Sequence, residues 1–284
     1  NIYSLYVIKL AKWFNLVMPI FVLFYQSTGM TMQDLFILKS IYSVTIVLFE
    51  IPSGYAADVL GRKRTLLAGS ILGALGFAIY SLNHAYLGFA VAEIILGLGH
   101  SFISGADSAM LYDTLLEKNR TSKYLEIEAR ITAVGNFAEA LAGIVGGFLA
   151  VASLRMPFYF QTLVAASAIP AALMLKEPGR DLIHKKMENI SDLFTGVRNA
   201  FIENRILMWV LFVSALTGLA TLTFAWFVQP WFKEAGLPIA LYGVMWTLLN
   251  LTAGATGLLA HRVEYRFKKI SMLVIILLIG TGFI

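Results

Sequence analysis

Four acidic residues lie within long apolar stretches of this 284-residue chain: Glu50, Glu93, Asp107 and Glu139. An uncompensated charge inside a bilayer costs at least ~2.5–3.5 kcal/mol, so an acid there calls for a function. Desolvation favours the neutral form of a carboxyl group, which can then take up and release a proton. This chemistry would suit proton coupling. Glu93 and Glu139 lie deepest and are our candidates for the coupling carboxylate, whereas Glu50 better suits a structural role and Asp107 fits either.

Helical spacing groups these acids with other polar residues. One stripe consists of Glu93, Gly97, His100, Ser104 and Asp107, and a second of Thr132, Asn136, Glu139, Gly143 and Gly146. Residues three and four apart share a helix face, so two adjacent polar faces predict a shared water-filled cavity, with His100 and Asp107 extending a polar path. Further candidates for the cavity wall are Asn15, Gln26 and Asn250. Each of these three would equally suit an interhelical hydrogen bond.

The composition requires lipid as the main solvent for this chain. It is 58% hydrophobic and 14% charged, with a mean hydropathy of +0.76, whereas soluble domains carry roughly 25% charged residues. Apolar runs of about 20 residues recur, long enough to cross a bilayer, and no alternating barrel pattern is present. We therefore predict an all-α polytopic membrane protein. The chain contains no cysteine, and we expect no cofactor, no metal and no nucleic-acid partner.

Nine membrane spans are predicted, the last one incomplete. They cover 13–27, 35–56, 65–82, 86–110, 129–151, 157–175, 207–228, 239–260 and 270–284. Of the 22 lysines and arginines, all but Lys39, Arg155 and Lys233 fall on one side of this arrangement. The positive-inside rule then places the amino terminus in the cytoplasm of a multi-pass plasma (inner) membrane protein. Because the chain begins without methionine and stops within an apolar run, we expect it to be truncated at both ends.

The spans divide into two unequal groups. We predict an N-terminal six-helix bundle over 1–175, a cytoplasmic linker over 176–206 and the start of a second bundle over 207–284. The linker carries an apolar stripe at helical spacing, which favours a surface-lying amphipathic helix over a solvated loop. Gln26 and Gly29 close the first span as Gln229 and Gly236 close the seventh, which indicates an internal repeat. Repeated halves are typical of transporters.

The segment GYAADVLGRKRT, from Gly54 to Thr65, joins the second and third spans. Gly54 permits a close helix approach and Gly61 a tight turn. Asp58 can meet a helix amino terminus or a cation, and Arg62 can bind a carboxylate in a forked geometry. Lys63 and Arg64 can anchor the loop to the inner leaflet. A loop that only fixes topology would not need this spacing.

On these residues the chain resembles the major facilitator superfamily, whose signature between helices 2 and 3 is matched by Gly54, Asp58, Gly61, Arg62, Lys63 and Arg64. Val59 departs from the usual basic residue. The resemblance implies the first nine of twelve transmembrane helices and alternating access around a central cavity. It also implies a cytoplasmic latch that stabilises the outward-open state, in which Asp113 fits the family's acidic partner for Arg62. The family's partner for Asp58, on helix 11, falls outside this sequence.

Within the family the pattern is most similar to bacterial drug-proton antiporters and uncharacterised relatives. Gly97 and Gly99 match a helix 4 motif, but Glu93 replaces its arginine and reverses the local charge. The glycines of AGIVGG, from Ala142 to Gly147, match part of a helix 5 motif that here lacks its proline. The resemblance implies a transporter more directly than a drug antiporter. We expect proton-coupled efflux of drug-like or cationic compounds, by a monomer.

Other functional classes fit less well. A proton-coupled uptake symporter for a small metabolite remains an alternative, because sequence separates direction poorly. A channel or scramblase is a more remote alternative, since no filter or pore ring is evident. An intramembrane enzyme is not indicated, because no HExxH or comparable motif is present. The expected partners are a small-molecule substrate, protons and the lipid bilayer. The aromatic residues Trp226, Trp231 and Tyr242 are predicted to form an interfacial belt.

Overall fold

The computed structural model describes residues 1–179 and 205–252, and all regular structure in these ranges is helical. Seven helical segments are long and apolar enough to cross a membrane: Ile2–Ser27, Met32–Leu60, Arg62–Leu82, Tyr86–Glu117, Thr121–Ala152, Met156–Leu173 and Arg205–Glu234. A shorter apolar helix covers Ile239–Thr252. The prediction of an all-α polytopic membrane protein is confirmed. The predicted ninth span and most of the predicted linker lie outside the described residues.

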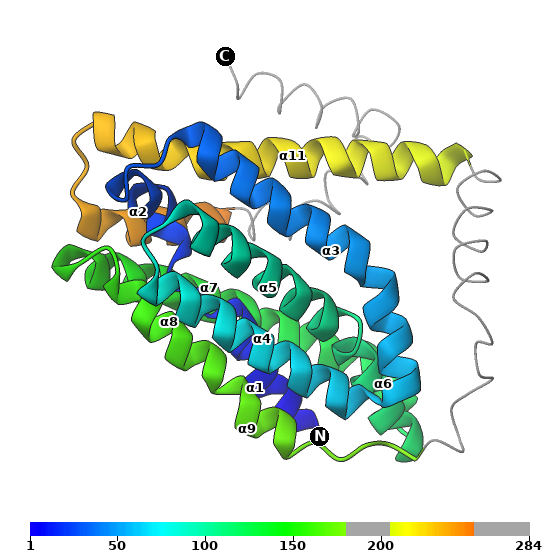
Figure 1. Cartoon of the computed structure of the whole chain (residues 1–284). Coiled ribbons are helices and arrows are strands. Elements are labelled where there is room, and N and C mark those ends of the chain that lie inside the picture. The colour runs from blue at the N-terminus through cyan, green and yellow to red at the C-terminus, as the bar shows by residue number, and fades with distance from the viewer. Residues whose placement is uncertain (180–204, 253–284) are drawn as a thin grey trace.

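Three of these segments are interrupted (Figure 1). The first consists of α1 (Ile2–Trp13), the 3-10 turn η1 (Met18–Ile20) and α2 (Phe21–Ser27); the fourth of α5 (Tyr86–Ser104) and α6 (Asp107–Glu117); the sixth of α8 (Met156–Ala166) and α9 (Ala168–Leu173). The others are α3 (Met32–Leu60), α4 (Arg62–Leu82), η2 (Thr121–Lys123) with α7 (Tyr124–Ala152), and α11 (Arg205–Glu234). Each break frees backbone groups that need new partners in an apolar environment.

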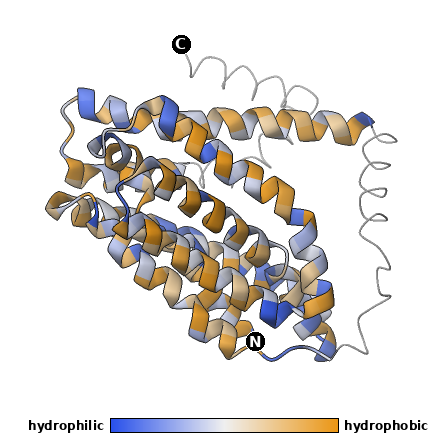
Figure 2. Cartoon of the chain, viewed as in Figure 1, coloured by the Kyte–Doolittle hydropathy of each residue, from blue (hydrophilic) through white to orange (hydrophobic). Residues whose placement is uncertain are grey.

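The helices run between two ends of the bundle, which we name after their turns. The Gly61 end carries Asn1, the turn between α3 and α4, and α6; the Gly29 end carries the turn between α2 and α3 (Figure 1). Hydrophobic residues dominate the lengths of the helices, and the most hydrophilic ones gather mainly near helix ends and turns (Figure 2). This distribution is that of a protein whose helix sides face lipid.

Local sequence explains how α3 begins and ends. Thr31 and Asp34 form a capping box, in which each side chain accepts a hydrogen bond from the other residue's backbone N–H. At the opposite end Gly61 has φ +104, a conformation that side-chain-bearing residues rarely adopt. The glycine lets α4 start at the next residue, so Arg62 follows directly on the turn. The tight turn predicted for Gly61 is thus confirmed.

The break in the first span is held by side chains from other helices. Asn15 accepts from the N–H of Val17 at 3.2 Å, and Gln161 of α8 accepts from the N–H of Leu16 at 2.8 Å. Gln229 of α11 spans the break, accepting from the N–H of Val22 at 3.0 Å and donating to the carbonyl of Met18 at 2.9 Å. Four of the backbone groups near the break therefore have side-chain partners, and one of these partners, Gln229, comes from the seventh span.

The first span begins earlier than predicted, at Ile2 rather than near residue 13. Lys9 and Lys12 therefore lie on a membrane-length helix and not in an N-terminal loop. Lys39, assigned above to the opposite side, also lies within a span, on α3. These three lysines carry no topological information. The charge bias does not depend on them, because Arg155 and Lys233 are then the only cations on the side opposite the basic segments.

Two buried clusters form the core, one toward each end. Toward the Gly29 end, aromatic side chains pack together, including those of Phe21, Phe24, Tyr25, Tyr80, Phe89, Phe158, Trp226 and Tyr242. Toward the Gly61 end the cluster is mainly aliphatic. The predicted aromatic belt is wrong for Trp226 and Tyr242, which are buried, whereas Trp231 is exposed. The belt prediction counted residues near a span end and had no information on which face they occupy.

The seventh span, α11, contacts the preceding helices toward the Gly29 end. Phe227 lies 5.6 Å from Phe36 between ring centroids, and Trp226 lies 5.8 Å from Phe21. At the other end α11 is exposed from Arg205 onward, and it diverges from α3 (Figure 1). The described residues before 180 and those of α11 therefore meet toward one end only.

The proposed repeat has a structural counterpart at two helix ends. Gly29 and Gly236 both have positive φ, +83 and +73. In each case the next residue donates a backbone hydrogen bond five residues back, from Met30 to Tyr25 and from Leu237 to Phe232. This is the same glycine-terminated helix ending, at equivalent places in the first and seventh spans.

Candidate functional site

A cavity of about 870 Å³ lies among α1, α2, α3, α4, α5, α7 and α11. Much of its wall is aromatic, with Trp13, Phe21, Phe36, Tyr42, Phe77 and Trp226 among the lining residues. Ionisable side chains also line it: Lys12, Lys39, Glu93, His100 and Glu139. The volume is that of a site for a drug-sized molecule, for which a mainly apolar wall with a few polar groups is typical.

The best-defined polar feature of the cavity is an ion pair between Lys39 of α3 and Glu93 of α5. The lysine Nζ lies 2.5 Å from Oε1 of Glu93, whose side chain is 1% exposed. Two tyrosine hydroxyls approach the same oxygen, that of Tyr80 at 2.5 Å and that of Tyr25 at 3.2 Å. The two hydroxyls also contact each other. Glu93 is thus fixed by three donors from three different helices.

Sequence reasoning identified Glu93 but missed its partners. Lys39 was counted as an outer-loop cation because it lies close to the start of the predicted second span. The available signal was that a lysine inside an apolar helix is itself a functional candidate. Tyr25 and Tyr80 gave no usable signal, because a tyrosine in a membrane span is common at interfaces. Their role depends on how α2 and α4 are rotated, which no local pattern specifies.

Of the other predicted cavity residues, Asn15, His100 and Glu139 line the cavity. His100 is bonded through Nδ1 to the hydroxyl of Tyr42 at 3.0 Å. Gln26, Asp107, Asn136 and Asn250 are not among the lining residues. The amide of Asn250 donates to the carbonyl of Trp246, within its own helix.

The predicted polar stripe of the fourth span is divided by the fold. The helix breaks at Gly105 and Ala106, so Asp107 begins a new helix, α6. Asp107 faces Lys9 of α1 at 3.5 Å, and Lys9 also binds Glu128 of α7 at 2.5 Å. This group ties three helices together outside the cavity. Ser104 likewise leaves the stripe, donating to Glu50 of α3 at 2.6 Å.

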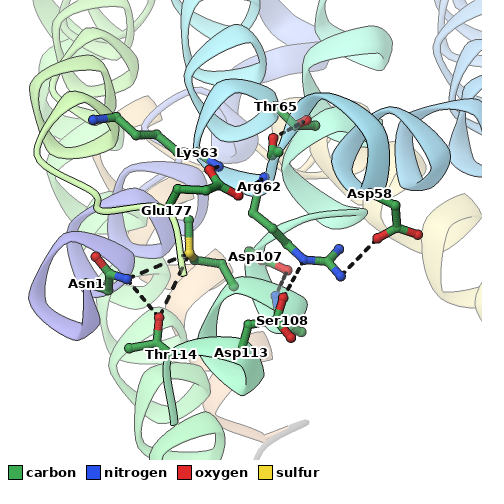
Figure 3. A network of polar contacts seen from close by, with 12 residues as sticks. Asn1, Asp58, Arg62, Lys63, Thr65, Asp107, Ser108, Asp113, Thr114 and Glu177 are labelled. Atoms are coloured by element: carbon green, nitrogen blue, oxygen red, sulfur yellow. Dashed lines mark hydrogen bonds and ion pairs between the residues drawn. The ribbon is translucent and has the colours of Figure 1, made fainter. Parts of the chain in front are cut away.

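A second charged site lies at the Gly61 end, around Arg62 (Figure 3). The guanidinium binds Asp58 at 2.9 Å through NH2 and Asp113 of α6 at 2.8 Å through Nε. Asp113 is 6% exposed and Asp58 is 35% exposed. The contact of Arg62 with Asp113 implied by the family resemblance is therefore present in the structure. We call Asp58, Arg62 and Asp113 the arginine network.

Glu177 adds a partner that the sequence did not suggest. Its carboxylate accepts from the backbone N–H groups of Arg62 at 2.7 Å and Lys63 at 2.9 Å, at the start of α4. A carboxylate at a helix amino terminus satisfies free donors and complements the helix dipole. The chain that leaves the sixth span is thereby attached to the signature loop. An acid directly after an apolar run was the only signal for this contact.

Gly54 differs from its predicted role. A Cβ added at Gly54 would meet nothing within 4 Å, whereas one at Gly105 would lie 3.2 Å from the backbone nitrogen of Gly54. The close approach at this point therefore depends on Gly105, at the break between α5 and α6. Glycines of the fifth span do sit at tight crossings: a Cβ at Gly146 would lie 2.0 Å from the carbonyl oxygen of Leu16.

Membrane-length helices around a cavity, with interrupted helices and an ion pair in the cavity wall, are typical of membrane transporters. Residues 7–284 match the model of the Major Facilitator Superfamily. The chain belongs to this family, whose members are transporters and not enzymes. The predicted fold class is confirmed on this basis as well.

Among the relatives found, the quinolone resistance protein NorA of Staphylococcus aureus strain MRSA252 is 23% identical over 199 residues, covering 69% of this chain and 50% of the relative. An uncharacterized MFS-type transporter of Methanocaldococcus jannaschii, MJ1560, is 23% identical, with 66% and 48% covered. The chain thus spans about half the length of these curated relatives. A crystal structure of a D-xylose-proton symporter has a TM-score of 0.63 at 14% identity, covering 94% of this chain and 68% of that one.

Proposed function

We propose that this chain is part of a secondary active transporter that exports drug-like or cationic small molecules from a bacterial cell in exchange for protons. The observation that carries the proposal is the cavity of about 870 Å³, whose aromatic wall holds the acids Glu93 and Glu139. Apolar and aromatic surface suits drug-like compounds, and acids facing it suit cations and protons. The relationship to the quinolone resistance protein supports export.

In this proposal the 1–175 bundle and the bundle that begins at 207 rock against each other around the cavity. The Gly61 end faces the cytoplasm, as the basic segments favour, and 176–206 forms the linker between the halves. The contacts of α11 near Gln229 and Trp226 then lie on the outer side.

Proton coupling is assigned to Glu93 or Glu139. For Glu93 the step is concrete: a proton on its carboxylate removes the charge that holds Lys39, so protonation and the ion pair exclude each other. Glu139 lines the same cavity from α7. We propose that His100, whose ring is bonded to the hydroxyl of Tyr42, relays protons along the cavity wall.

Transport in proteoliposomes tests this proposal. Full-length protein is reconstituted and given a panel of organic cations and neutral metabolites outside vesicles with an acidic lumen. Antiport predicts uptake into the acidic lumen that stops when a protonophore dissipates the gradient. Uptake only with the opposite gradient would identify a symporter, and flux that ignores the gradient would identify a channel. Both results would overturn the proposed export.

Two matched variants, Glu93→Gln and Glu139→Gln, locate the coupling residue. Neutralising the coupling carboxylate should abolish gradient-driven uptake and spare the exchange of labelled for unlabelled substrate, which requires no net proton movement. If Glu93 is the coupling residue, Glu139→Gln should retain both activities. If both variants keep full gradient-driven uptake, coupling does not depend on either acid.

The orientation can be tested with single cysteines, because the 284 residues contain none. Ser122→Cys places a thiol at the Gly61 end and Ala85→Cys at the Gly29 end, both at exposed positions. In intact cells an impermeant thiol reagent should label the protein with Ala85→Cys and leave the one with Ser122→Cys unlabelled. The reverse pattern would place the amino terminus outside.

A further inference from the structure

The ammonium group of Lys39 lies within a cage of three aromatic rings. Its Nζ is 3.8 Å from the ring centroid of Phe21, 5.6 Å from that of Trp226 and 5.8 Å from that of Tyr42. The rings come from α2, α11 and α3, and all three line the cavity. Several aromatic faces around one cation form the arrangement by which proteins recognise alkylated ammonium groups.

The carboxylate beside this cage has an unused acceptor. Oε1 of Glu93 receives the three donors described above, while Oε2 is buried and has no hydrogen-bond partner. Among the described residues it is one of only a few buried polar side-chain atoms in this condition. A buried carboxylate oxygen is costly to leave unpaired, and Glu93 is part of the cavity wall. The carboxylate therefore has an acceptor position that one more donor or cation could satisfy.

From these two observations we propose that the aromatic cage and Glu93 form a subsite for an organic ammonium group, and that Lys39 occupies it as a tethered substitute when no ligand is bound. The inference rests on the proposal that the cavity receives the transported molecule. A ligand cation would take the place of the lysine ammonium against Phe21, Trp226 and Tyr42. The Glu93 carboxylate would then pair with the ligand.

The chemistry of lysine suits this role. Its charge is a compact ammonium on a flexible four-carbon stem, and its side chain is 19% exposed, compared with 1% for Glu93. The lysine can therefore withdraw while the acid stays in place, held by the hydroxyls of Tyr25 and Tyr80. An empty carrier would keep its acid neutralised, and a ligand would have to compete with the protein's own cation.

Competition has a measurable consequence. If Lys39 fills the cage roughly nine-tenths of the time, an external cation binds about tenfold more weakly than to the vacant cage. Lys39→Met removes the charge and keeps an unbranched side chain that is one atom shorter, so it should tighten cation binding by about tenfold. Lys39→Arg keeps a cation and serves as the matched control, with weak binding expected as in the unsubstituted protein.

Binding is measured by equilibrium dialysis of full-length protein with phenyltrimethylammonium. tert-Butylbenzene, its neutral isostere, and benzenesulfonate, an anion of similar size, are the comparison probes. Lys39→Met should improve the binding of phenyltrimethylammonium and not that of the neutral or anionic probe. Adding Glu93→Gln to the Lys39→Met protein should remove this gain in affinity. Equal gains for cation and neutral isostere would show that the substitution merely enlarged the cavity, and no gain for any probe would also overturn the proposal.

A second measurement does not require the Lys39→Met protein to be stable. Lys39→Cys introduces the only thiol of the 284 residues, and phenyltrimethylammonium should slow its modification while benzenesulfonate should not. Attaching a trimethylammonium group through 2-(trimethylammonium)ethyl methanethiosulfonate should restore weak cation binding, and attaching a neutral methyl group should not. Cation binding that is indifferent to the attached charge would contradict the proposal. Because these readouts are of binding, a failure of transport alone would contradict the proposed function and leave the subsite intact.

Discussion

The ion pair of Lys39 with Glu93, which we call the cavity pair, and the arginine network use the same chemistry in different surroundings. In the cavity, Lys39 meets a single carboxylate that is 1% exposed and backed by two tyrosines. At the Gly61 end, Arg62 binds two carboxylates, one of which is 35% exposed. A cation shared between two acids near a helix end can lose one partner and keep the other. The cavity pair has no such reserve.

This difference predicts which site tolerates the loss of one charge. In a buried pair, removing one partner leaves the other uncompensated and costs about 3–5 kcal/mol, whereas Arg62 keeps a second carboxylate partner when either acid of the arginine network is removed. The cavity pair should therefore dominate stability. The arginine network should instead act on the balance between conformations, for which a small energy is sufficient.

The largest effect is expected for Glu93→Gln. The substitution leaves the Lys39 ammonium among aromatic rings without a counter-charge, and we expect a loss of about 3–5 kcal/mol in stability. Thermal unfolding in detergent measures this as a lower midpoint. The double variant Lys39→Met with Glu93→Gln removes both charges and should recover most of the loss. A double variant no more stable than Glu93→Gln would show that the ion pair is not what the substitution disrupts.

The two sites also differ in how far the sequence predicted them. The arginine network was predictable because Asp58 and Arg62 are four residues apart, and their spacing with Gly61 matches a family signature. Its third member, Asp113, followed from the resemblance alone. Glu177 was not predicted, since its contact joins the end of the sixth span to the start of the third, 115 residues away.

The cavity pair was only half predicted for a related reason. Burial cost identified Glu93 without its neighbours, but its pairing with Lys39 joins two helices across 54 residues. Whether two such side chains meet depends on the rotation and depth of each helix, which packing decides. The same limit applies to the polar stripe of the fourth span, where helical spacing continues through Gly105 and the structure does not.

The breaks in the spans show a further limit of periodicity. The number and approximate positions of the described spans follow from hydropathy, which responds to length and composition. The interruption after Trp13 is stabilised by Gln161 and Gln229, from distant parts of the chain. Pro19 was a local sign that the helix is irregular here, but it does not say which side chains take over the freed groups. Tertiary partners therefore determine where a span can break.

A smaller effect separates the two acids of the arginine network. Asp113→Asn removes a carboxylate that is 6% exposed, and Asp58→Asn removes one that is 35% exposed. Both substitutions should impair transport, and Asp113→Asn should do so more. A change of about 1.4 kcal/mol shifts the balance of two conformations tenfold.

Spin labels attached through Leu125→Cys and Ile206→Cys, exposed positions on α7 and α11 toward the Gly61 end, report that balance as a distance distribution. Glu126→Gln is the matched control, because it breaks the exposed pair with Arg130, in which the side chains are 52% and 68% exposed, and should shift nothing. Equal shifts for Asp113→Asn and Asp58→Asn would mean that burial does not determine how much each acid contributes to the conformational balance. Shifts as small as that of the control would mean that the arginine network only fixes membrane topology.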